Sequence, residues 1–315
     1  MERKTIRLFL KVSYLIIICF ILIPSFSFSQ RNILKVGEIS FFSSCILDEK
    51  TYLVVGDLGT IYRTEDGGKK WVKVHSNVNS TLYSISHAGG NILFVSGADG
   101  LILKSCDGGK SWKKQNVKLK RSLFSISFFN ELKGVAVGDW GTILYTENGG
   151  ETWQNVSWKE DVILYKASYA DRDNVWVVGE IGTILGSSNG GKSWKNYLSP
   201  VQSTLTSIDF NNRDKGIVVG IDGVIFETEN SGKNWRRLTG FPSVHFYDIA
   251  YKDSIAVCVG DYSTILFRDS KNWAKLEVPS YLSTFWLSGV SLRKLRDHTL
   301  ILAVGKKGII IMDKK

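Results

Sequence analysis

Short apolar runs alternate with polar, glycine-containing turns along almost the whole chain. One unit shows the pattern clearly: Leu123–Phe129 is rich in aromatic and branched residues, Val135–Val137 is a second apolar run, and Thr142–Thr146 is a third. Trp153 opens a fourth run. Aromatic and β-branched residues favour strands, and the glycines of the turn at 138–141 allow backbone angles that other residues resist. The pattern predicts four antiparallel strands in about 41 residues, the size of one propeller blade.

This unit recurs at a nearly fixed interval. A glycine at the turn between the second and third runs repeats every 41 residues through five units and then returns twice more, at Gly56, Gly97, Gly138, Gly179, Gly220, Gly260 and Gly305. A repeat of this length with strand-like content indicates a propeller. We therefore predict an all-β fold, a seven-bladed β-propeller of four-stranded antiparallel blades.

The two ends of the repeat region complement each other. The seventh unit ends in its third strand, Ile309–Ile311, without the tryptophan strand that completes earlier units. Residues 32–36 have the pattern of such a fourth strand. We expect this N-terminal segment to pair into the last blade and close the ring, because closure removes exposed sheet edges that promote aggregation. Residues 30–315 then form a single propeller domain.

Residues 1–29 have the pattern of a signal peptide. Basic residues between Arg3 and Lys11 precede the apolar run Val12–Ile23, and the small residues Ser27 and Ser29 fit a cleavage site. An uncleaved membrane anchor is the alternative, although the apolar run is short for a membrane span. We expect an exported protein that is periplasmic, exposed at the cell surface or secreted.

The turn between the third and fourth strands carries the most specific motif, Thr64-x-Asp66-x-Gly68-x-x-Trp71. The next four units repeat it, ending at Trp112, Trp153, Trp194 and Trp235. The Asp or Asn oxygen can accept backbone N–H bonds, the glycine takes a left-handed conformation, and the tryptophan covers the turn. The motif resembles the Asp box, or BNR repeat, of sialidase-like propellers. That resemblance implies a structural role, so these residues are poor candidates for a site.

Charge and reactive residues give few further indications. The formal charge is +10, and the predicted leader contributes four basic residues and one acid, which leaves the remainder near +7. This modest excess allows an acidic partner or a membrane surface and gives no reason to expect nucleic acid. The three cysteines outside the leader and the four histidines are isolated, and no Ser–His–Asp order, HExxH motif or phosphate loop is present. We predict no catalytic residues, no metal and no cofactor.

The turns between second and third strands share one face of a propeller and carry both acids and apolar residues. Their acids are spread around a ring rather than gathered as a metal shell: Asp57, Asp99, Asp139, Glu180, Asp222 and Asp261. Turn tips are usually polar, so apolar tips hint at a partner surface: Leu58, Trp140, Ile181 and Tyr262. Trp158, in the segment that leads to the next blade, is expected on the same face. We predict that these side chains contact a protein or stack on a sugar; in the alternative, Trp140 and Trp158 fold down as local packing.

Basic and buried charged residues complete the list of candidates. Lys118, Lys120 and Arg121 follow the fourth strand of the second unit and are candidate contacts for an acidic protein or an anionic lipid surface. In the alternative, these cations only guard a solvent-exposed outer strand. Lys166 and Asp248 replace small serines at equivalent innermost positions, and we expect them near the channel, in an ion pair or lining a water-filled tunnel.

A phrase of the form Val-Gly-(Asp/Glu)-x-Gly-Thr-Ile-Leu is clearest at Val137–Leu144 and Val178–Leu185. Together with the Gly-Gly-Lys-x-Trp phrase that follows it, it resembles the photosystem II stability and assembly factor family over nearly the whole chain after the leader. The resemblance implies a seven-bladed, exported, non-catalytic scaffold that binds assembling membrane proteins through a basic surface. We therefore predict a monomeric binding scaffold with a protein partner in a membrane or envelope complex. The alternative is a glycan-binding or glycoside-hydrolysing, sialidase-like propeller.

Overall fold

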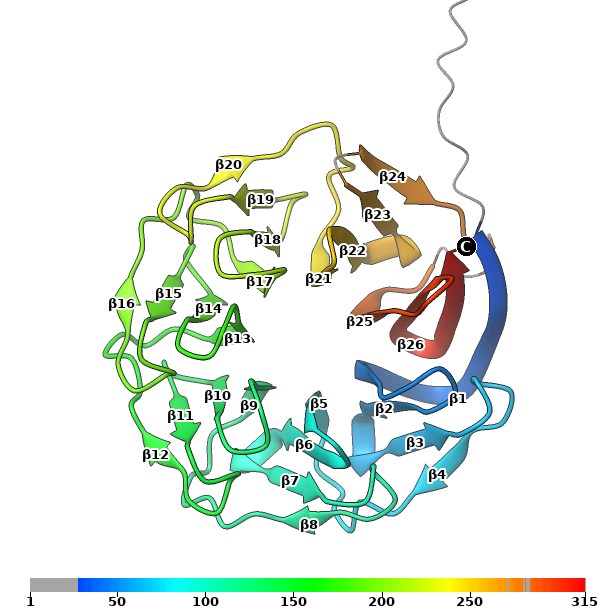
Figure 1. Cartoon of the computed structure of the whole chain (residues 1–315), viewed down its shortest axis with the longest axis horizontal. Coiled ribbons are helices and arrows are strands. Elements are labelled where there is room, and N and C mark those ends of the chain that lie inside the picture. Colours follow the sequence, from blue (N-terminus) through cyan, green and yellow to red (C-terminus); the bar gives the residue numbers. More distant parts are fainter. Residues whose placement is uncertain (1–27, 271, 280, 282–283, 315) are drawn as a thin grey trace, which may run out of the picture.

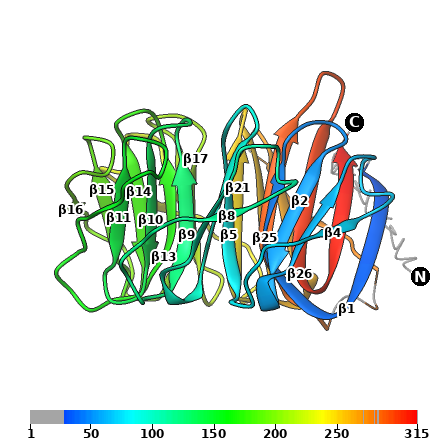
Figure 2. The same cartoon turned by 90° about the horizontal axis from the view of Figure 1, so that it is seen from below.

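The computed structural model describes residues 28–270, 272–279, 281 and 284–314. Within this part, blades stand side by side around a central axis (Figure 1), and the turns of the strands lie at the two opposite faces of the ring (Figure 2). The predicted leader at 1–29 lies outside the described residues, apart from Phe28 and Ser29, which begin the first strand. No helix in the described part of the chain is long and apolar enough to cross a membrane.

Five blades are separate four-stranded antiparallel sheets, each running from an inner strand at the axis to an outer strand at the rim. Blade 2 contains β5 (Leu82–Gly89), β6 (Ile92–Gly97), β7 (Ile102–Ser105) and β8 (Lys113–Lys114); blade 3 contains β9 (Leu123–Phe128), β10 (Gly134–Gly138), β11 (Ile143–Thr146) and β12 (Gln154–Asn155). Blade 4 contains β13 (Leu164–Tyr169), β14 (Val175–Gly179), β15 (Ile184–Ser187) and β16 (Lys195–Asn196); blade 5 contains β17 (Leu205–Phe210), β18 (Gly216–Gly220), β19 (Ile225–Thr228) and β20 (Arg236–Arg237). Blade 6 contains β21 (Phe246–Lys252), β22 (Ile255–Gly260), β23 (Ile265–Asp269) and β24 (Asn272–Leu276).

The first and last blades are joined through two long strands. The joined sheet has the order β25 (Leu287–Lys294), β26 (Thr299–Lys314), β1 (Phe28–Ile46), β2 (Tyr52–Gly56), β3 (Ile61–Thr64) and β4 (Val72–Val74). The first part of β26 pairs with β25, and its second part pairs with the beginning of β1, where Asn32 lies opposite Ile311. The end of β1 then pairs with β2 near the axis. The predicted seven-bladed propeller, closed by an N-terminal strand in the last blade, is confirmed (Figure 1).

The hydrophobic core lies between neighbouring blades. All five residues of β2 are buried, and their side chains alternate between the two sides of the blade. Leu53 and Val55 pack towards blade 2, whereas Tyr52 and Val54 pack towards the last blade. Because both faces of β2 are covered, its sequence is a continuous apolar run and not an alternation of apolar and polar residues.

The Asp-box turns are held by their own motif residues. In blade 3, the backbone N–H groups of Asn148 and Gly150 donate to Thr146 Oγ1 at 3.3 and 3.0 Å, and the N–H of Thr152 donates to Asn148 Oδ1 at 3.0 Å. Gly150 has a φ of 78°, and a Cβ there would lie 2.9 Å from the ring of Phe94 in blade 2. In the other four turns the N–H of the equivalent glycine likewise donates to the hydroxyl of the first motif residue. These turns therefore fix the blades and pin each one to its neighbour.

The sixth blade lacks the Asp-box motif and is joined to its neighbour by other contacts. Arg268 is buried there, with its guanidinium carbon 4.9 Å from the centre of the Tyr251 ring and 5.2 Å from that of Trp273. Its Nη1 lies 2.7 Å from Glu227 Oε2 of blade 5. A cation between two aromatic rings, paired with a carboxylate of the preceding blade, therefore joins blades 5 and 6 where the Asp box is absent.

Polar residues of the innermost strands tie each blade to the next. The N–H of Ile126 donates to Ser84 Oγ at 3.3 Å, and the N–H of Val290 donates to Asp248 Oδ2 at 2.9 Å. Lys166 cannot accept such a bond, and its Nζ instead lies 2.7 Å from Asp248 Oδ1. The Ser207 hydroxyl also donates to Asp248 Oδ1, at 2.7 Å. The expected ion pair near the channel is present. It lies among the hydrogen bonds that connect the innermost strands, which gives it a structural role.

Candidate functional site

The turns between second and third strands form what we call the crown face, and in blades 1 to 6 their tips are residues 57–59, 98–100, 139–141, 180–182, 221–223 and 261–263. Three of the turns are 3-10 helices: η1 (Asp57–Gly59), η2 (Ala98–Gly100) and η3 (Asp261–Ser263). The four predicted apolar tips are strongly exposed: Leu58 by 71%, Trp140 by 61%, Ile181 by 66% and Tyr262 by 68%. The structure therefore places these candidates at the tips of separate blades on one face.

The backbone of the crown turns forces these side chains outward. All four apolar tip residues have positive φ, between 53° and 57°. The glycine that follows a tip packs directly on the segment that leads to the next blade; a Cβ on Gly59, for example, would lie 1.9 Å from the carbonyl oxygen of Val78. Positive φ is a true outlier for a β-branched residue such as Ile181. Strain of this kind at an exposed apolar residue is a reason to look for function there.

The crown acids fall into two classes. Asp99 and Asp222 occupy the tip itself, with φ of 56° and 58°, whereas the other acids precede the tip. Asp139 Oδ2 accepts the N–H of Ser122 at 3.2 Å, and Glu180 Oε2 accepts the N–H of Ile163 at 2.9 Å. Asp139 and Glu180 therefore brace their turns against the first strand of their own blade.

An arc of aromatic residues lies inside this ring of acids. In every blade the pairing between first and second strands is interrupted at the same place by a bulge, and the skipped residues are Phe42, Tyr83, Phe124, Tyr165, Thr206, Tyr247 and Ser288. The first four form a continuous series of ring contacts, with centroids 5.8, 5.0 and 5.9 Å apart. Bulges re-aim side chains. Sequence reasoning missed this arc, although its members are spaced by the same interval as the crown glycines.

The crown acids lie close enough to the tyrosines of the arc to interact with them electrostatically. Burial raises the pKa of Tyr83, and the negative charges of Asp139, Asp57 and Asp99 raise it further. Burial, together with a 2.9 Å hydrogen bond to Asp261, raises the pKa of Tyr247 to about 12. These tyrosines therefore stay neutral at physiological pH and offer hydroxyl donors beside carboxylates.

Trp158 requires a correction. The expectation that it is exposed beside Trp140 is wrong: Trp158 is half-buried and packs against the core between blades 3 and 4, and its indole nitrogen is buried. Its backbone explains the position, because the N–H of Trp158 donates to the carbonyl of Gly141 at 2.7 Å and draws the segment under the crown turn. For this residue the local-packing alternative describes its position.

The basic candidates flank the tip of blade 3. The Arg121 guanidinium carbon lies 5.1 Å from the centre of the Trp140 ring, and its Nη1 donates to the Trp140 carbonyl at 3.5 Å. Lys118 and Lys120 are exposed on the segment that packs over η2, where Leu119 touches Gly100. The structure thus joins Arg121 to Trp140 and places the two lysines beside the neighbouring tip.

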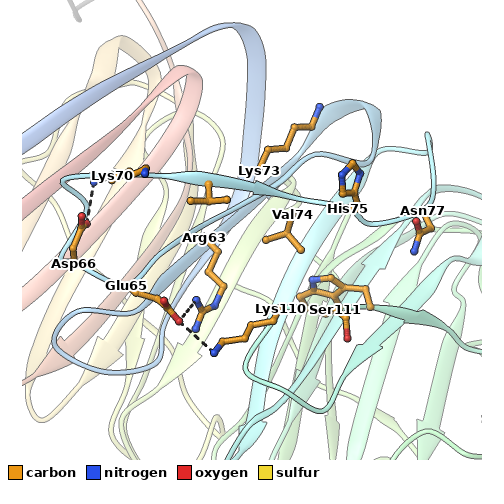
Figure 3. Close-up of a pocket in the computed structure, with 12 residues that line it drawn as sticks. Arg63, Glu65, Asp66, Lys70, Lys73, Val74, His75, Asn77, Lys110 and Ser111 are labelled. Atoms are coloured by element: carbon orange, nitrogen blue, oxygen red, sulfur yellow. Dashed lines mark hydrogen bonds and ion pairs between the residues drawn. The ribbon is translucent and has the colours of Figure 1, made fainter.

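A groove of about 640 Å³ lies at the rim, between the outer part of blade 1 and the Asp-box turn of blade 2 (Figure 3). Val72, Val74 and the buried Trp112 supply its apolar lining. Arg63 crosses it, donating from Nε to the Gly108 carbonyl at 2.8 Å and pairing with Glu65 at 2.6 Å. Sequence reasoning missed this groove as well.

The channel between the innermost strands holds a second polar group. Asp209 accepts the Ser168 hydroxyl at 2.8 Å and the N–H of Tyr251 at 2.8 Å. Burial raises the pKa of Asp209 despite these bonds and the nearby charge of Lys166. Within the described residues, no three or more His, Cys, Asp or Glu side chains gather as metal ligands. These two bonds join blade 5 to blades 4 and 6, whereas the ion pair between Asp248 and Lys166 joins blade 6 to blade 4.

Comparison with known families decides the assignment. The family model of the photosynthesis system II assembly factor YCF48 matches residues 70–162, 106–199 and 153–245, which together span more than half of the 315 residues. The chain belongs to the YCF48 family. The resemblance inferred from Val137–Leu144 and Val178–Leu185 is confirmed, since both phrases lie inside the matched ranges.

Solved YCF48 structures share the fold. A YCF48 bound to D1 peptide superposes with a TM-score of 0.73 at 20% identity, covering 90% of this chain and 96% of that one. YCF48 from Cyanidioschyzon merolae gives a TM-score of 0.69 at 17% identity, with 91% and 98% covered. The GH74 xyloglucanase from Xanthomonas campestris gives 0.73 at 12% identity, with 90% of this chain and 53% of the enzyme covered. At these identities the likeness shows the fold alone. Comparison with curated protein sequences gave no match.

Proposed function

We propose that this chain is an exported, non-catalytic scaffold whose crown face binds a protein during assembly of a membrane or envelope complex. Membership of the YCF48 assembly-factor family supports the assembly role. The description of one YCF48 structure as bound to D1 peptide supports a polypeptide as the class of partner. The leader pattern at residues 1–29 supports export.

The observation that carries the proposal is the set of exposed apolar tips at positive φ. Leu58, Trp140, Ile181 and Tyr262 are held out from four different blades, so together they span the face. Exposed aromatic and branched side chains with a polar surround are typical anchors of protein interfaces. The crown acids and Arg121 supply that polar surround.

The same geometry argues against glycoside hydrolysis. Glycosidases use two carboxyl groups roughly 5–10 Å apart across an open cleft, one of them free to donate a proton. Asp139 and Glu180 instead accept backbone N–H groups of their own blades, and Asp261 accepts the hydroxyl of Tyr247. Their bonds stabilise the turns, so we propose no catalytic role for them.

Affinity capture from the native envelope, with chemical crosslinking, tests the binding face. The tip variant combines Leu58→Ser, Trp140→Ala, Ile181→Asn and Tyr262→Ala; the control combines Lys69→Ser and Lys233→Ser, both exposed on Asp-box turns. We expect the wild type and the control to capture the same partner and the tip variant to lose it, although the tip variant melts at a temperature no lower than that of the control. Equal capture by both variants would contradict the proposal, as would release of sugar from a glycan panel.

Export needs a separate experiment. Fractionation of cells that express the full chain should place it outside the cytoplasm, and a variant without residues 1–29 should stay in the cytoplasm. A full-length chain recovered from the cytoplasm would contradict this part of the proposal while leaving the binding face untouched.

A further inference from the structure

The groove in Figure 3 runs along an open sheet edge. β4 is the last strand of its sheet, so its outer edge has no neighbouring strand among the residues that the structure describes. β4 has three residues, the outer strands β8, β12, β16 and β20 have two each, and β24 of blade 6 has five. An open edge offers backbone N–H and C=O groups to an incoming strand, and peptides bind many proteins by adding a strand in this way.

At one position of its outer strand, blade 1 lacks the usual protection of such an edge. Natural sheets guard edges with charged side chains, especially lysine. At the repeat position of Val72, the next four blades have polar or charged residues, namely Lys113, Gln154, Lys195 and Arg236. Val72 is 54% exposed and pairs across the sheet with Arg63, on the side that faces blade 2. Blade 1 therefore presents an apolar residue where blades 2 to 5 present polar or charged ones.

The second wall of the groove comes from blade 2. Trp112 and the residues before it belong to the Asp-box turn, and Trp112 packs in the core between the two blades. The side chain of Arg63 links the two walls, because its Nε donates a hydrogen bond to the carbonyl of Gly108 in blade 2. A strand added to β4 would thus lie on a fixed floor, with alternate side chains over Val72 and Val74.

Charge selects the occupant. The groove is lined by Arg63, Lys70, Lys73 and Lys110, against only two acids. Those acids are already held: Glu65 by Arg63 and Lys110, and Asp66 by the Thr64 hydroxyl and the N–H of Lys70. Lys70 and Lys73 are exposed at the rim and available to carboxylates of a ligand, and the exposed Lys110 shares Glu65 with Arg63.

We propose that the groove along β4 binds an extended acidic segment of a protein partner, added to blade 1 as a further strand. The backbone of the segment bonds to β4, its apolar side chains lie on Val72 and Val74, and its carboxylates meet Lys70, Lys73 and Lys110. The groove contains none of the crown tips, so it is a second binding surface beyond the crown face.

A labelled, end-capped peptide with the sequence (Glu-Val)3 is the probe, and binding is measured by fluorescence anisotropy. We expect the wild type to bind it, and a probe with alternate backbone amides N-methylated to lose binding, since methylation removes the strand-pairing donors. A probe with lysine in place of glutamate should not bind. Equal binding of the methylated probe, or no binding of the parent probe, would overturn the proposal.

Matched variants locate the site. Val72→Ser should weaken the probe about tenfold through lost apolar contact, whereas Lys195→Ser, at the same repeat position of blade 4, should leave affinity unchanged. Lys110→Glu should weaken binding by a similar factor, and Lys233→Glu, the equivalent change in blade 5, should not. If Val72→Ser and Lys195→Ser bind alike, the groove is not the site. Concentration-dependent dimers that the probe dissociates would instead identify a second copy of this chain as the occupant.

Discussion

The Asp-box turns and the crown turns lie at the opposite faces of the ring, and the same repeat builds both. On the Asp-box face the side chains bond to their own backbone, as Thr146 does to Gly150, and the residue types change little from blade to blade. On the crown face the backbone shape is constant, but the tip residue changes from Leu58 to Asp99 to Trp140. The side chains of the Asp-box face therefore stabilise the fold, whereas those of the crown tips are exposed to solvent by a backbone of constant shape. The difference separates stability from recognition within one repeat.

The largest expected effect lies on the Asp-box face. Gly232 has a φ of 69°, and a Cβ there would lie 2.2 Å from the ring of Trp176 in the preceding blade. Gly232→Ala should lower the free energy of unfolding by about 3 kcal/mol or more, because overpacking adds to an unfavourable φ. Denaturant unfolding measures it. Gly240→Ala is the control, since Gly240 has a φ of 90° and open space around it; if both variants lose the same amount, the clash has no part in the effect.

A smaller loss is expected when a single bond of the turn is removed. Thr146→Val keeps the shape of the side chain and removes the oxygen that accepts the N–H of Gly150, which is buried. We expect a loss of about 1–3 kcal/mol of unfolding free energy from the unpaired donor. Trp140→Ala on the crown should change stability by less than about 0.5 kcal/mol. Equal losses from the two substitutions would remove the distinction between the faces.

On the crown face a substitution should increase stability and impair function. Ile181 has a φ of 53°, which asparagine tolerates far better than a β-branched residue does. Ile181→Asn should therefore raise the free energy of unfolding by about 1 kcal/mol and weaken partner capture. The same substitution at Ile184, a buried strand residue without this strain, should strongly destabilise the protein. An Ile181→Asn variant that is less stable than the wild type would show that the tip is not strained.

The smallest expected effect concerns acid. Although desolvation opposes it, hydrogen bonds from Ser111, Ser105 and the N–H of Lys110 lower the pKa of Asp107 to about 2. A carboxylate with a lowered folded-state pKa stabilises the fold above its unfolded pKa, near 4, and loses that contribution as the pH falls towards 2. Asp107→Asn should therefore flatten the stability profile in this range. Asn148, at the same place in blade 3, cannot titrate, so Asn148→Asp should steepen it.

The fold could be predicted because its causes are local and repeated. Each of the first five units carries its own turn glycines and motif tryptophan, and the incomplete seventh unit indicates where the segment at 32–36 must go. Even the loss of the Asp box in the sixth unit was visible in sequence. What Arg268 does there was not, because its contacts with Tyr251 and Glu227 join residues from two blades.

The candidate surfaces could be predicted only in part. The exposed tips follow from turn chemistry, and four of them are where the repeat places them. The position of Trp158 cannot be predicted from turn chemistry, because its burial depends on how its segment packs under Gly141. The aromatic arc and the groove required comparison across blades: Phe42 and its successors share one repeat position, and Val72 matters because Lys113 and Lys195 do not resemble it.

The shared last blade has a consequence for the order of events during synthesis. Asn32 pairs with Ile311, and Ser44 of β1 contacts Ser291 across a separation of 247 residues, so the ring has no partial version that already contains its closing contacts. Pairing between such distant segments is slow compared with local hairpin formation. Early blades can form their hairpins as the chain emerges, but the final latch waits for the last strand. A chain that closes late lacks its final ring contacts for most of its synthesis, a state compatible with the export that we propose.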